Sequence, residues 1–130
     1  MERVFLDANV LFSAAYKPNT RLLELWRLKN ISLWSSRYAL EEAKVNLSKE
    51  DQQRRLLKLA DSLSLCEASH RKIPTGIHLP DKDLPILQAA IEAEANYLLT
   101  GDMHHFGTYL GRIIEGVRIL TPGDYLKKSR

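Results

Sequence analysis

Cysteine, glycine and proline are scarce in this chain, and these shortages limit its architecture. The 130 residues include one cysteine, Cys66, which excludes an internal disulfide and a thiolate metal site. The 6 glycines and 5 prolines are spread along the sequence, so no linker or low-complexity stretch divides it. We therefore expect a single domain over residues 1–130, a common domain size.

Long apolar runs are also lacking. No stretch approaches the roughly 18 apolar residues that a membrane span needs. The apolar run that follows Arg3 is interrupted by Asp7, which is too early for a signal peptide. We expect a cytoplasmic protein with no membrane partner.

A large excess of one charge is missing as well. The chain has 19 Lys and Arg against 16 Asp and Glu, a formal net charge of +3. Such a small excess does not by itself indicate a nucleic-acid partner. The positions of the acidic residues therefore carry more information than their number.

What is present is an alternation of strand-like and helix-like segments. Short β-prone runs lie at residues 3–6, 31–34, 64–68, 97–100 and 117–120. Helical patterns separate them, and a loop is expected over residues 69–80. This alternation is typical of βα units in a parallel sheet covered on both faces. It predicts an α/β fold, a three-layer α/β/α sandwich around a mainly parallel sheet of about five strands.

One predicted helix, over residues 49–63, is strongly charged. Its leucines, including Leu56 and Leu57, are expected on the buried side. Arg54, Arg55 and Lys58 are expected on a solvated face, which is the usual place for such a run of charges.

Four carboxylates fall where strands end or helices begin. Asp7 directly follows the first strand, and Asp102 follows the fourth by two residues. Asp83 stands where a helix-capping residue is expected, before Pro85 in the first turn, and Glu42 lies in the second turn of the helix after the second strand. Because the carboxyl ends of parallel strands share one edge of the sheet, these acids should cluster there.

Clustered carboxylates repel one another, and a divalent cation is the simplest compensation. Oxygen donors without cysteine suit Mg²⁺ or Mn²⁺. One or two such ions would neutralise phosphate charge and activate a water. The pattern therefore favours phosphodiester hydrolysis.

The sequence pattern alone does not decide the role of every acid or the choice between neighbouring acids. Asp7 is also placed to cap the helix that follows it, and Asp102 is also placed as a turn residue after Gly101. On the loop before the helix, Asp81 is an alternative to Asp83. Helical periodicity does not choose between Glu41 and Glu42, which lie on either side of the apolar face.

Two adjacent histidines, His104 and His105, follow Asp102. Neighbouring helical residues point about 100° apart and seldom share a metal ion. We therefore expect a structural role or one at the edge of a substrate site.

Other enzyme classes with similar strand-end acids lack a required residue here. A phosphatase of the haloacid-dehalogenase type needs a second aspartate two positions after Asp7, where this chain has Asn9. A response-regulator receiver needs a phosphoacceptor aspartate after a central strand, and residues 64–68 supply none. A dinucleotide site lacks its glycine-rich turn.

Three segments resemble the signature blocks of the PIN-domain family, which includes VapC-like toxins and PIN-type ribonucleases. They are LDANV at residues 6–10, ALEEAKVNL at 39–47, and the stretch from DLPILQAA at 83–90 to ANYLLTGD at 95–102. The blocks occur in order and span roughly the whole chain. The resemblance implies a single PIN-like nuclease domain.

Carried over residue by residue, the resemblance implies that Asp7, Glu42, Asp83 and Asp102 hold Mg²⁺ or Mn²⁺ and form the catalytic site. The family pattern selects Glu42 over Glu41. It further implies that Asn9 braces the first aspartate and Thr100 the last by hydrogen bonding.

The resemblance also implies a function and partners. The function is metal-dependent hydrolysis of RNA, single-stranded or structured, with the chain as the toxin of a toxin–antitoxin pair. The implied protein partners are an antitoxin and a second copy in a homodimer. The alternative is an inactive PIN-like module that binds RNA or protein, and the presence of all four acids favours the enzyme.

Overall fold

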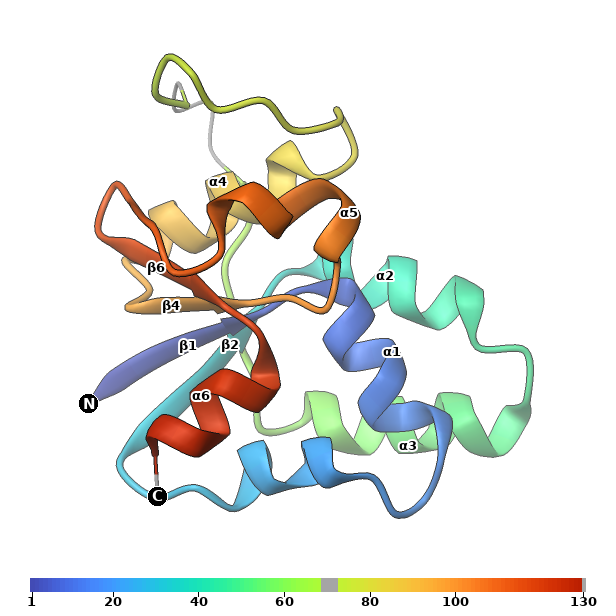
Figure 1. Cartoon of the computed structure of the whole chain (residues 1–130). Coiled ribbons are helices and arrows are strands. Elements are labelled where there is room, and N and C mark those ends of the chain that lie inside the picture. The colour runs from blue at the N-terminus through green and yellow to red at the C-terminus, as the bar shows by residue number, and fades with distance from the viewer. Residues whose placement is uncertain (69–72, 130) are drawn as a thin grey trace.

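A six-stranded sheet forms the centre of the computed structural model (Figure 1), which describes residues 1–68 and 73–129. The strand order is β3-β2-β1-β4-β6-β5. All neighbouring strands are parallel except β5, which runs antiparallel to β6. The strands are β1 (Glu2–Leu6), β2 (Ile31–Ser35), β3 (Ser64–Leu65), β4 (Tyr97–Leu99), β5 (Ile113–Ile114) and β6 (Val117–Leu120).

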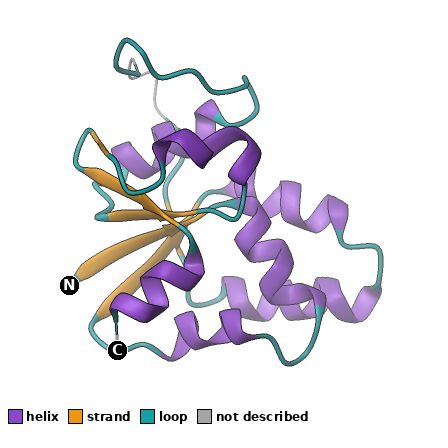
Figure 2. Cartoon of the chain, in the orientation of Figure 1, coloured by secondary structure: helices purple, strands orange, loops and turns teal. Residues whose placement is uncertain are grey.

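Helices cover both faces of this sheet, which confirms the predicted α/β sandwich (Figures 1 and 2). On one side lie α4 (Leu84–Glu92) and α5 (Met103–Phe106), the latter followed by the 3₁₀ turn η2 (Gly107–Tyr109). The other side carries α1 (Ala8–Tyr16), the 3₁₀ helix η1 (Arg21–Arg27), α3 (Glu50–Ala60) and α6 (Pro122–Lys128). Helix α2 (Arg37–Asn46) packs against α1 and also contacts α4. None of the described helices combines the length and apolar composition that crossing a membrane requires.

The two central strands are buried on both faces. Phe5 and Leu6 of β1 and Leu98 and Leu99 of β4 have no exposed surface. Burying each such side chain contributes about 1.5–3 kcal/mol. The ends of β1 and β4 are therefore firmly packed, and they hold the residues that follow them in fixed positions.

The chain changes direction at these same two strands. From β1 it proceeds outward through β2 and β3, and it then returns to β4 on the other side of β1. The amide of Asp7 donates to the carbonyl of Leu99 at 3.0 Å, so the segments that leave the two strands start side by side. Open α/β sheets bind their ligands at such a switch point.

Two strand predictions need correction. The predicted third strand, 64–68, pairs only over Ser64–Leu65, and the predicted loop 69–80 lies partly outside the described residues. Strand β5 was not predicted, because two residues are too few to show alternation. It forms a hairpin with β6 across Glu115 and Gly116, both with positive φ.

The charged helix α3 also packs differently from the prediction. Leu56 is buried, but Leu57 is 60% exposed. The face next to α1 is partly polar: Gln52 donates to the carbonyl of Tyr16, and Arg55 donates to the carbonyls of Ala15 and Tyr16. Arg55 thus satisfies the free carbonyls at the end of α1 rather than lying on a solvated face.

Candidate metal centre

Asp7 lies at the end of β1 and is almost fully enclosed, with 4% of its surface exposed. Its Oδ1 accepts the amide of Ala8 at 2.6 Å, so it caps α1. Its Oδ2 accepts from Thr100 Oγ1 at 2.8 Å and from Asn9 Nδ2 at 3.0 Å. Burial raises the pKa of Asp7 to about 6 despite these hydrogen bonds, and the charges of Asp83 and Glu42 add to the increase.

Asn9 and Thr100 link Asp7 to the segment after β4. The side-chain oxygen of Asn9 accepts the amide of Gly101 at 2.7 Å, and Thr100 Oγ1 accepts the amide of Asp102 at 3.0 Å. Gly101 leaves room for this contact, because a Cβ there would lie 3.3 Å from Asn9 Oδ1. Asn9 contacts the first aspartate as predicted, whereas the Thr100 side chain binds the carboxylate of Asp7 and only the backbone of Asp102.

Asp102 caps the short helix α5. Its Oδ1 accepts the amides of His104 and His105 at 3.1 and 3.0 Å. Partial burial acts to raise the pKa of Asp102, but these bonds and the contact with the His105 ring outweigh it, and the pKa is lowered. The charged form of the carboxylate is therefore favoured, and its Oδ2 lies 2.8 Å from Nδ1 of His105.

Asp83 occupies the N-cap position of α4, with Pro85 in the first turn, as predicted, but its side chain makes no capping hydrogen bond. The backbone at Asp83 is already helical, with φ −96° and ψ −20°, so the side chain is not positioned to cap the helix. The residue is 7% exposed, and burial raises the pKa of its carboxyl group. Its buried Oδ2 has no hydrogen-bond partner within the described part of the chain.

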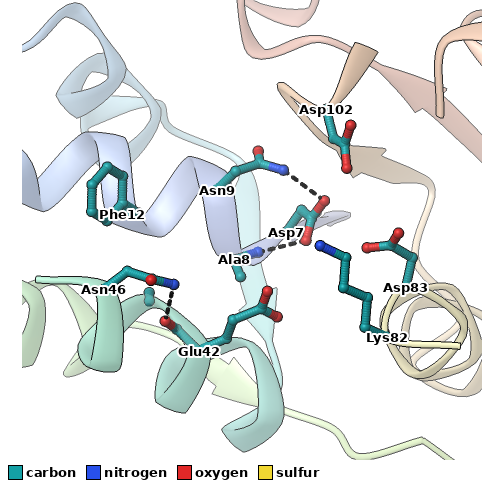
Figure 3. A pocket seen from close by; sticks show the side chains of 10 residues that line it. Asp7, Ala8, Asn9, Phe12, Glu42, Asn46, Lys82, Asp83 and Asp102 are labelled. Carbon is teal, nitrogen blue, oxygen red and sulfur yellow. Dashed lines mark hydrogen bonds between the residues drawn. The ribbon is translucent and has the colours of Figure 1, made fainter. Parts of the chain in front are cut away.

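The carboxylates of Asp7, Glu42, Asp83 and Asp102 line one open pocket of about 470 Å³, together with Asn9 and Lys82 (Figure 3). The structure thus brings the four predicted residues to one place. Lys82 extends into the pocket beside Asp83, and its charge opposes the increase in the pKa of Asp83.

The two alternative acids lie elsewhere. Asp81 is exposed and does not line this pocket. Glu41 is exposed and does not line this pocket; it borders a separate depression along α2, whose lining also includes Tyr38, Val45 and Glu42. Of each pair, the residue that the sequence analysis preferred is the one at the pocket.

The sequence analysis missed the placement of His105 and Lys82. Nδ1 of His105 lies 2.8 Å from Oδ2 of Asp83 and 2.8 Å from Oδ2 of Asp102. The spacing of Asp102 and His105, three residues apart at the start of a helix, was the available signal, since such residues share a face. Adjacent histidines seldom share an ion, but this does not bear on a histidine and the aspartate three residues before it.

The donor set fits a divalent cation. Ligand atoms of Asp83, Asp102 and His105 all lie within 4.8 Å of one another. Asp7 and Asp83 are buried acids whose pKa values are raised, and a cation would remove the repulsion between them. Among the described residues, the buried Oδ2 of Asp83 has no hydrogen-bond partner, so this oxygen is suited to bind a cation.

A comparison with models of known protein families identifies the family of this chain. A family model described as PIN domain matches residues 3–104. The chain belongs to the PIN-domain family. The matched segment of this PIN domain contains all four carboxylates of the pocket and ends one residue before His105.

Solved structures support the same fold. This PIN domain is similar to a chain in the crystal structure of VapBC2 from Rickettsia felis bound to a DNA fragment from their promoter. The two share 20% sequence identity with a TM-score of 0.70, over 92% of this chain and 98% of that one. A search of curated proteins found no match.

Proposed function

We propose that this chain is a single PIN-like nuclease domain that hydrolyses RNA phosphodiester bonds with the help of Mg²⁺ or Mn²⁺. The observation that carries the proposal is the convergence of Asp7, Glu42, Asp83 and Asp102 on one open pocket at the switch point of the sheet. A cluster of acids that is open to solvent, adjoined by Lys82, suits a cation together with the phosphate of a nucleic acid.

The four carboxylates would hold one or two ions and form the catalytic site. A bound ion would neutralise charge on the phosphate and lower the pKa of a water that attacks phosphorus. The chain's own residues prepare this site. Asn9 and Thr100 fix the orientation of the Asp7 carboxylate, and the Lys82 ammonium is placed to contact a phosphate oxygen.

Asp102 would bind the ion through one of its two carboxylate oxygens. Its Oδ1 is occupied by two backbone amides, which leaves Oδ2, 2.8 Å from Nδ1 of His105, as the oxygen available to an ion. A fixed carboxylate of this kind loses little conformational entropy when it binds an ion.

We further propose that the chain is the toxin of a toxin–antitoxin pair and acts in the cytoplasm, where its RNA substrate is available. Membership of the PIN family and the similarity in fold to a chain of VapBC2 support this proposal. An antitoxin and a second copy of the chain are the expected protein partners. Expression of the chain should slow growth, and co-expression of the neighbouring open reading frame should restore it; unchanged growth on expression alone would contradict the toxin role.

The test of the nuclease is RNA cleavage by purified protein with Mg²⁺ or Mn²⁺. Asp7→Asn and Asp102→Asn each remove one charge from the pocket while keeping the size of the side chain. Asp81→Asn is the matched control, since it makes the same change at an exposed position outside the pocket.

We expect wild type and Asp81→Asn to cleave RNA, and both pocket variants and chelator-treated wild type to be inactive. Cleavage that persists in both pocket variants would refute the assignment of the site. RNA binding without turnover, insensitive to chelator, would instead support the alternative of an inactive RNA-binding module.

A further inference from the structure

His105 lies among the pocket carboxylates, whereas its neighbour His104 is exposed. The side chain of His105 is 22% exposed, and its Nδ1 is fully buried. This nitrogen is 2.8 Å from Oδ2 of Asp83 and 2.8 Å from Oδ2 of Asp102. It therefore lies between two acids that come from different elements of the fold.

These two short contacts do not give the ring nitrogen of His105 a well-formed hydrogen bond. A ring N–H points in one direction, so it cannot donate well to two oxygens at once. Among the described residues, the buried Nδ1 of His105 and Oδ2 of Asp83 both lack a hydrogen-bond partner of acceptable geometry. A histidine held purely as an ion-pair partner would direct its N–H at one carboxylate, and that is not seen here.

The spacing also suits ligands around one ion. Ligand atoms about 2.1 Å from an octahedral ion lie about 3.0 Å from each other at adjacent positions. The two separations of 2.8 Å from Nδ1 are close to that value. The side chain of Asp83 is 90% enclosed, with 10% exposed, and its Oδ2 is otherwise unpartnered.

The backbone holds His105 in this position. Its amide donates to Oδ1 of Asp102 at 3.0 Å, so the same aspartate that contributes Oδ2 also anchors the residue. His105 is therefore oriented before any ion binds.

We propose that Nδ1 of His105 is a direct ligand of the metal ion held by Asp83 and Asp102, and that this nitrogen makes the site prefer Mn²⁺ to Mg²⁺. Imidazole nitrogen binds transition metals better than Mg²⁺, which favours oxygen donors and water. As a ligand, His105 is neutral and presents the Nδ1 lone pair. The inference rests on the proposed metal-dependent function and adds a donor outside the segment matched by the family model.

The test measures metal binding without RNA, on protein whose affinity tag has been removed. Mn²⁺ is the probe, and pulsed electron paramagnetic resonance detects the ¹⁴N coupling of a directly bound imidazole. The variants are His105→Gln and, as the matched control, His104→Gln, which makes the same change at the adjacent exposed residue. Titration calorimetry with Mn²⁺ and Mg²⁺ gives the ratio of affinities for each protein, and circular dichroism checks folding.

We expect a ¹⁴N coupling in wild type and His104→Gln that is lost in His105→Gln. The ratio of Mn²⁺ to Mg²⁺ affinity should fall at least about tenfold in His105→Gln, as is usual when a group that supports a metal site is removed. Bound Mn²⁺ without imidazole coupling in wild type would overturn the inference and leave His105 as an ion-pair partner, with the nuclease proposal intact. Coupling that survives in His105→Gln would also overturn it. Absence of Mn²⁺ binding in wild type would overturn this inference, and absence of binding of both Mn²⁺ and Mg²⁺ would overturn the nuclease proposal as well.

Discussion

Replacing Asp7 by Asn should make the stability of the metal-free protein less sensitive to pH. Burial raises the pKa of Asp7 from 3.8 to about 6. At about 1.4 kcal/mol per pKa unit, ionising this carboxyl in the folded protein costs about 3 kcal/mol more than in the unfolded chain. Because the folded pKa is the higher one, the stabilising contribution is complete below about pH 4 and is lost as the pH rises through about 6.

The variant has no such dependence at this position, but it loses a hydrogen bond. The carboxylate accepts from Ala8 on one oxygen and from Thr100 and Asn9 on the other, and an amide has only one oxygen. That loss costs about 1.5–3 kcal/mol at any pH where the wild-type group is charged. The two effects nearly cancel near neutrality, so the informative quantity is the change with pH rather than the absolute stability.

The assay is urea unfolding in EDTA at about pH 4.5 and about pH 7.5, with Asp81→Asn as the control for removing one acidic charge. Between these two values the difference in unfolding free energy between Asp7→Asn and wild type should shift by about 2 kcal/mol in favour of the variant. Adding Mn²⁺ at the higher pH should stabilise the folded protein, because only the folded site binds the ion. Wild type should gain more than the variant, because the variant lacks the Asp7 carboxylate. A difference that is the same at both pH values would refute the argument from burial.

Three further results are expected. Thr100→Val removes the hydroxyl that donates to the buried carboxylate of Asp7 and accepts the part-buried amide of Asp102, and should lower the unfolding free energy in urea by about 1–3 kcal/mol, since both groups lose this partner. Leu98→Ala should cost about 2–5 kcal/mol in the same assay, because Leu98 is fully buried. The exposed Leu57→Ala should change stability by no more than about 0.5 kcal/mol, and equal losses for the two leucines would contradict the packing. Glu42→Gln should reduce metal-dependent RNA cleavage at least about tenfold while Glu41→Gln leaves it unchanged, and equal effects would contradict the choice between them.

The sequence predicts the sheet well where local pattern and tertiary structure agree. Apolar runs mark the buried strands β1, β2, β4 and β6, and a parallel sheet with covered faces follows from the helices between them. The short outer strands leave no such pattern, because two paired residues show no period. Leu57 was misplaced because helix periodicity assumes an apolar face, whereas α3 uses Gln52 and Arg55 to bind the end of α1.

The placement of the four acids in one pocket can be predicted from the geometry of a parallel sheet. In a parallel sheet, residues that follow different strands share an edge, so Asp7 and Asp102 can be placed together without knowing any side-chain contact. The choice between neighbouring acids needed the family resemblance, since Glu41 and Glu42 are equivalent by periodicity. The approach of His105 to Asp83 was not predictable, because it depends on how the segment before α4 packs against α5.

The lengths of β3 and β5 have a consequence for assembly. These outermost strands pair over two residues each, so each of them offers another chain only a short stretch of strand backbone. Extension of the sheet by a second copy or by an added peptide strand would gain few hydrogen bonds, and such short edges also protect against aggregation. We therefore expect a protein partner to bind mainly through side chains on the helices and loops, and interface variants should be sought there.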